Sequence, residues 1–156
     1  MAEADEAAGA AGAGFDLPTH LAYLRAAIAE AQAAPLSARK AMLAVLLMDA
    51  YADRLFAAQT EADDILAFRA GQAAAAPALG LVFDQAAGRA RLVTEAVQMP
   101  LEEYDRLSVQ DFMVSLYNGH TVQRVLVVGA DGVKHDVHAV LAEAVGVLAH
   151  RRPPLP

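Results

Sequence analysis

The sequence predicts an α+β domain in which three N-terminal helices precede a ββαββα segment with a mostly antiparallel four-stranded sheet. Alanine accounts for 38 of the 156 residues, and 32 of these alanines fall within residues 1–90, which favours helices there. Apolar residues follow a helical period up to about Pro77 and an alternating period after it. The dipeptide Asp131-Gly132 is typical of a tight β-hairpin turn.

We expect one domain over residues 15–150, with a helical part at 16–76 and a sheet-containing part at 78–150. Residues 1–14 are small, acidic and punctuated by glycine, so they are expected to form a disordered arm. Residues 151–156 have the sequence RRPPLP, which cannot continue a helix, and they are expected to form a short tail.

The helical part contains three expected helices. The first begins after Asp16 as N-cap and runs to about Ala33. The second begins after Ser37 and is apolar on nearly all sides over 42–48, so it is expected to be central. The third begins at Thr60, where the spacing to Asp63 indicates a capping box.

The sheet-containing part begins with an expected hairpin. Leu79, Leu81 and Phe83 alternate, and a QAAG loop ending at Gly88 then leads to a second alternating strand over 89–97.

A capping box of Ser108 and Asp111 opens a further helix, which Asn118 and Gly119 end. The next strand, over 122–129, contains the stretch VLVV, which is apolar on both faces and therefore indicates a central strand.

The last expected elements are a return strand over 133–136 and a C-terminal helix. A two-residue turn at Asp131-Gly132 would place His135 opposite Val128. Asp136 is the expected N-cap of the final helix, which presents apolar residues at helical spacing over 137–148.

Composition excludes several kinds of site. The chain has no cysteine, so it has no disulfide, thiolate zinc site or iron–sulfur cluster. The net charge of −7 and the scattered basic residues argue against nucleic-acid binding. A third, weaker hypothesis is that Arg89 and Arg91, on one face of a strand, bind nucleic acid. No apolar run is long enough for a membrane span, and the acidic N-terminus is unlike a secretory signal, so we expect a cytoplasmic protein.

Histidines offer the main candidate chemistry. His120, His135, Asp136 and His138 lie close in sequence, but the expected strand places His120 roughly 16 Å from the others, too far to share a metal ion. The candidate ligand-binding residues are His135, His138, Tyr117 and His120, and Tyr117 could rim a pocket together with Asn118 and Gly119. We predict no catalytic residue, bound metal or cofactor.

Asp49 and Asp53 lie four residues apart on the most apolar helix, where a buried acidic pair could hold magnesium. Pairing with Arg25, Arg39 or Arg54, or simple exposure near the helix end, is the favoured interpretation. Ser37 and Lys40 match the S-x-x-K spacing of a serine nucleophile, but Ser37 is better explained as a helix cap.

These observations favour a non-catalytic protein-interaction or regulatory module that binds a protein partner or itself, and we expect a homodimer. The alternative is a small-ligand or metal-binding domain or enzyme that uses His135 and His138.

Overall fold

The computed structural model describes residues 16–58 and 64–151. In order, the elements are α1 (Leu17–Ala33), α2 (Ala38–Ala58), α3 (Ile65–Ala75), α4 (Pro77–Ala86), β1 (Arg91–Gln98), the 3-10 helix η1 (Leu101–Arg106), α5 (Val109–Tyr117), β2 (Thr121–Val128), β3 (Lys134–Asp136) and α6 (Val137–His150). The expected arm at 1–14, the capping box at Thr60 and residues 152–156 of the tail lie outside the described residues.

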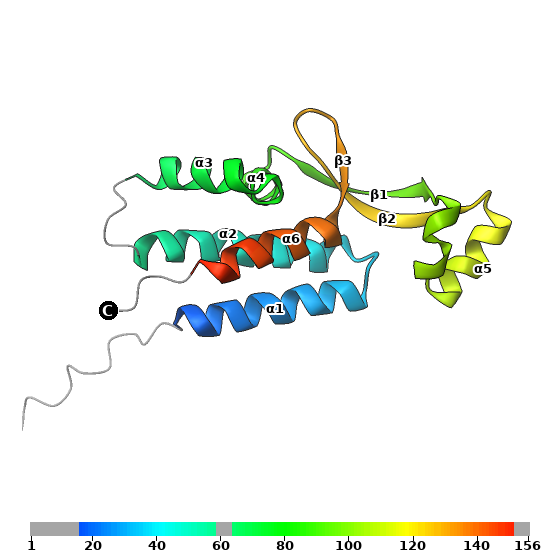
Figure 1. Ribbon diagram of the computed structural model, residues 1–156, viewed down its shortest axis with the longest axis horizontal. Coiled ribbons are helices and arrows are strands. Elements are labelled where there is room, and N and C mark those ends of the chain that lie inside the picture. Colours follow the sequence, from blue (N-terminus) through cyan, green and yellow to red (C-terminus); the bar gives the residue numbers. More distant parts are fainter. Residues whose placement is uncertain (1–15, 59–63, 152–156) are drawn as a thin grey trace, which may run out of the picture.

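Five helices form a body at one end of the molecule, and β1 and β2 leave it as a long arm (Figure 1). The far end of this arm carries η1 and α5, which we call the tip. None of the helices in the described ranges is long and apolar enough to cross a membrane.

Helix α2 is the centre of the body, as its apolar sequence predicts. It contacts α1, α3, α4 and α6. One side of α2 supplies buried residues to the core throughout its length, among them Val45, Met48 and Leu55.

Four predicted helix starts are confirmed by their capping hydrogen bonds. The side chain of Asp16 accepts from the backbone N–H of Thr19 at 2.9 Å, and Ser37 accepts from Lys40 at 3.3 Å. The other two caps are Ser108 at the start of α5 and Asp136 at the start of α6. These bonds satisfy backbone donors that have no partner within the helix.

The predicted strand over Leu79, Leu81 and Phe83 is wrong, because these residues belong to helix α4. The buried residues of α4 include Ala78, Leu79, Val82 and Phe83, a pattern with helical rather than alternating spacing. Pro77 occupies the first turn of this helix, where a missing N–H costs nothing. A short apolar run is compatible with both the helical and the alternating period, so the alternation of residues 79–83 did not identify a strand.

Gly88 ends α4 rather than forming the predicted hairpin loop. It has φ +77, its N–H donates to the carbonyl of Gln85, and the N–H of Arg89 donates to the carbonyl of Asp84 at 2.7 Å. This is the usual way in which a glycine closes a helix C-terminus.

The protein is therefore α+β, but the predicted four-stranded ββαββα sheet is wrong. The sheet has three antiparallel strands in the order β1-β2-β3. The pairing of β1 with β2 runs from Arg91 opposite Val128 to Gln98 opposite Thr121. Strand β2 is central, and residues 125–128 are buried on both faces, as the stretch VLVV predicts.

The turn between β2 and β3 also differs from the prediction. Gly132 has φ +78, whereas Asp131 does not have the positive φ that a type I′ turn requires at both central positions. The N–H of Gly129 donates to the carbonyl of Val133, which leaves a three-residue loop. His135 consequently lies opposite Val127 instead of Val128, and this shift of one residue moves it to the other face of the sheet.

The helical assignment of α4 predicts unequal effects of two leucines that a strand would treat alike. Leu79 is fully buried and Leu81 is only half-buried. We expect Leu79→Ala to lower the free energy of unfolding by about 2–5 kcal/mol and Leu81→Ala by about 1 kcal/mol. Urea unfolding measures both, and equal losses would contradict the helix.

Candidate protein-interaction surface

The tip depends on few contacts for its position. Helix α5 has nine residues, a length at which an isolated helix is marginal in water. Ser108 caps its start, and Gly119 and His120, both at φ +64, turn the chain from its end into β2. Its packing partner in the sheet is β2.

The side of α5 that faces the sheet is polar. Ser115 is fully buried, and its hydroxyl donates to the carbonyl of Phe112 at 2.7 Å. Asp111 accepts a hydrogen bond from the guanidinium of Arg124 on β2 at 3.3 Å, and the pair is only partly exposed. A serine and an ion pair thus occupy the positions where a surface helix ordinarily buries apolar side chains.

The opposite side of α5 is apolar and exposed. Its residues recur at spacings of three and four, so they share one face. This face, here called the tip stripe, consists of Val109 (82% exposed), Phe112 (41%), Met113 (49%), Leu116 (52%) and Tyr117 (83%). Helix α5 is therefore inverted: its polar side faces the sheet and its apolar side faces outward.

Acidic side chains lie beside the tip stripe on η1. Glu102 and Asp105 are exposed there, whereas Glu103 and Arg106 of the same segment line a separate cavity. Tyr104 connects η1 to the helix, because its ring meets Phe112 edge-on with centroids 6.2 Å apart.

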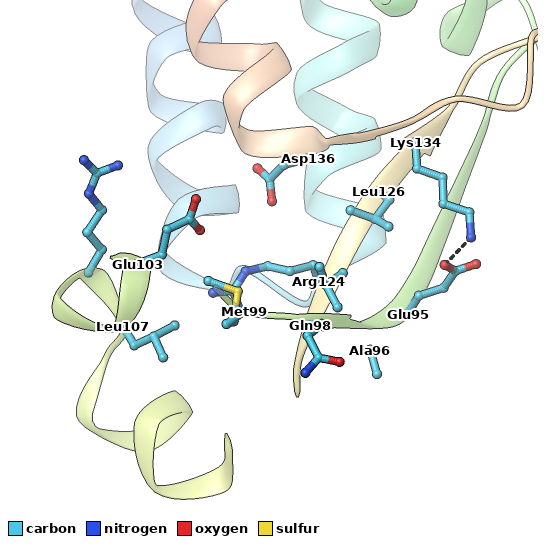
Figure 2. A pocket seen from close by; sticks show the side chains of 12 residues that line it. Glu95, Ala96, Gln98, Met99, Glu103, Leu107, Arg124, Leu126, Lys134 and Asp136 are labelled. Atoms are coloured by element: carbon cyan, nitrogen blue, oxygen red, sulfur yellow. Dashed lines mark hydrogen bonds and ion pairs between the residues drawn. The ribbon is translucent and has the colours of Figure 1, made fainter. Parts of the chain in front are cut away.

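A separate open cavity of about 660 Å³ lies between η1 and the sheet. Figure 2 shows Glu103 from η1, Met99 and Arg124 on one side of it, with Asp136 facing them. Lys134 on β3 forms an ion pair of 2.6 Å with Glu95 on β1, which bridges the two outer strands across β2. The cavity is lined by three carboxylates and three cations, so it has no net charge of its own.

The structure separates the histidines of the predicted ligand site. His135 lies on β3 opposite Val127, a residue of the hydrophobic core, and does not line the cavity. His138 lies in the first turn of α6, with Nε2 3.0 Å from the carbonyl oxygen of Pro35. Within residues 16–58 and 64–151, no three His, Asp or Glu side chains are placed to hold a metal ion.

The other two predicted ligand residues, Tyr117 and His120, belong to the tip at the opposite end of β2. The ring of His120 meets Tyr104 edge-on, with centroids 5.8 Å apart. Tyr117 is 83% exposed and is part of the tip stripe.

Asp49 and Asp53 form an ion-pair network, but with a different arginine from those predicted. Arg69 on α3 approaches Asp49 at 2.7 Å and Asp53 at 2.6 Å, and its guanidinium lies 4.6 Å from the ring centre of Phe83. Burial by itself would lower the pKa of Arg69, but hydrogen bonds to the two carboxylates outweigh it and hold the pKa above its ordinary value. Both carboxylates are thus engaged by a permanent cation.

The sequence analysis did not identify His20 as a buried residue. His20 on α1 is 2% exposed, and its Nε2 lies 2.9 Å from the carbonyl oxygen of Leu47 on α2. Tyr51 packs edge-on against the ring, and burial raises the pKa of this tyrosine. Its helical spacing with Leu24 and Ile28, which lie on the buried face of α1, could have indicated that His20 is buried.

Comparison with known proteins identifies no family for this chain. No protein-family model, curated protein or solved structure matches the chain.

The Arg69 network predicts a stability effect with a matched control. Arg69→Gln leaves two partly buried carboxylates without their cation, so we expect the free energy of unfolding to fall by about 1–2 kcal/mol. Arg89→Gln removes the more exposed ion pair with Asp84 and should change it by less than about 0.5 kcal/mol. Denaturant titration compares them, and a loss no larger for Arg69→Gln than for Arg89→Gln would show that the network does not stabilise the body.

The inverted orientation of α5 predicts opposite effects at two adjacent residues. Ser115→Leu forces a larger side chain between α5 and the sheet and should destabilise the protein by about 1–3 kcal/mol. Leu116→Gln alters an exposed residue and should change stability by no more than about 0.5 kcal/mol in dilute protein. Unfolding monitored together with hydrogen exchange of the α5 amides tests this, and the reverse ranking would disprove the orientation.

Proposed function

We propose that this protein is a non-catalytic protein-interaction module that docks through the tip stripe of α5. The observation that carries the proposal is the inverted helix, which buries Ser115 and turns Val109, Leu116 and Tyr117 outward. An apolar face has no stabilising role when it points away from its own core. Contact with another protein would remove this face from water.

The spacing of the stripe suits recognition by a groove. Val109, Met113 and Leu116 have the i, i+4, i+7 spacing of the anchor residues with which amphipathic helices enter apolar grooves. Phe112 and Tyr117 add aromatic rings, and tyrosine in particular is enriched among residues that dominate binding energy. Because Ser108 and Arg124 already hold the helix, little ordering remains to oppose binding.

The size of the stripe supports the same function. At 41% and 83% exposure, Phe112 and Tyr117 alone leave on the order of 250 Å² uncovered, since an aromatic side chain has about 150–250 Å². Three further stripe residues extend this area. Contiguous patches of this size on soluble proteins often mark interaction sites.

A photoreactive phenylalanine analogue at Met113 tests the proposal in cells that naturally contain the protein. We expect illumination to trap a protein adduct at Met113, and the same probe at the exposed Glu143 on α6 serves as the control. Adding Leu116→Asp in the same stripe should weaken binding and reduce the adduct roughly tenfold, as a loss of about 1.4 kcal/mol would. Adduct formation no greater at Met113 than at Glu143 would overturn the proposal.

A further inference from the structure

A second exposed apolar face lies on α2, on the side turned away from the core. Leu43, Leu46 and Ala50 share this face, and Leu36 in the preceding connection adds to it at the same end. The three leucines are 44–52% exposed, whereas Ala44, Val45 and Met48 on the other side of the helix are buried. We call Leu36, Leu43, Leu46 and Ala50 the α2 face.

The α2 face and the tip stripe carry opposite charges at their margins. Arg39 and Lys40 flank the α2 face, and neither forms a salt bridge within the described residues. Beside the tip stripe, Glu102 and Asp105 likewise form no salt bridge in that part of the chain. Basic side chains at one surface thus match acidic ones at the other.

Charge also argues against two tips meeting each other. Such a contact would bring the acidic η1 segments of both copies together, and like charges across an interface are unfavourable. The α2 face offers both an apolar surface and the opposite charge.

The arm places these two surfaces at its two ends. The first turn of α2 lies beside the base of the arm, while α5 lies at the far end (Figure 1). The contact of His138 with Pro35 joins the α1–α2 connection to the end of β3 and confirms that placement. Eight residues of β-strand separate base from tip by roughly 26 Å. Two arms side by side in opposite directions would place each tip near the first turn of α2 in the other copy, where the α2 face begins.

We propose that the partner of the tip stripe is a second copy of this chain, and that the tip stripe of each copy docks on the α2 face of the other. This inference rests on the proposed function of the tip stripe and adds its partner. One two-fold axis relates both contacts, so the assembly closes at a dimer and contains the same interface twice.

Single cysteines test the arrangement, because the chain has none of its own. Proteins carrying Met113→Cys and Leu43→Cys are mixed and oxidised. We expect disulfide-linked dimers in the mixture and few in either variant alone, with Glu143→Cys mixed against Leu43→Cys as the control. Self-linkage of Met113→Cys equal to linkage in the mixture would show tip-to-tip contact and overturn the inference.

Exchange of the charges between the two surfaces provides a second test. Light scattering over a dilution series should show a dimer for the unaltered protein and a dissociation constant raised about tenfold or more by Arg39→Glu with Lys40→Glu, equivalent to about 1.4 kcal/mol. Combining this pair with Glu102→Lys and Asp105→Lys should restore the dimer. Absence of restoration, or a monomer at every concentration, would overturn the inference.

The two proposals fail in distinguishable ways. If the photoreactive probe at Met113 traps only a different protein, the tip stripe is still a docking surface, but its partner is not a second copy. If the probe traps nothing above the control at Glu143, both proposals are wrong.

Discussion

Strand β2 belongs to both the body and the arm, and the rest of the structure depends on how its residues are buried. Its second half, residues 125–128, is enclosed on both faces and joins β1 to β3. Its first half continues into the arm beneath α5. In that first half Val122 is buried and Gln123 is exposed, so a slip of one residue would exchange their faces, and this contrast in burial fixes the register of the sheet.

That register determines what α5 presents to its surroundings. Arg124 on β2 donates a hydrogen bond to Asp111, and Ser115 on the same side of α5 is buried. The polar side of the helix therefore packs against the sheet. The apolar side must then point outward. The protein thus holds a short helix in a fixed orientation by polar contacts and keeps its apolar residues for a partner, at the end of an arm that its own body does not cover.

The sequence predicted the parts of this architecture that local chemistry determines. Helix caps such as Asp16 and Ser108, and the doubly buried stretch VLVV, depend on near neighbours and were correct. Residues 79–83 were assigned to a strand because their alternation ignored Val82, which is buried beside Phe83. The period of α5 shows which residues share a face, but it cannot show which face meets the sheet. Tyr117 was therefore singled out as a candidate binding residue, but the exposed tip stripe to which it belongs was not predicted.

Solvent reactivity along α5 tests the central claim most directly. In a cysteine-free chain, a cysteine introduced at residue 115 or at residue 116 can be labelled with a maleimide in dilute protein. The inverted helix predicts rapid labelling at 116 and strong protection at 115. Protection at 116 with rapid labelling at 115 would mean that α5 packs its apolar side on the sheet, and the tip stripe would then not be a docking surface.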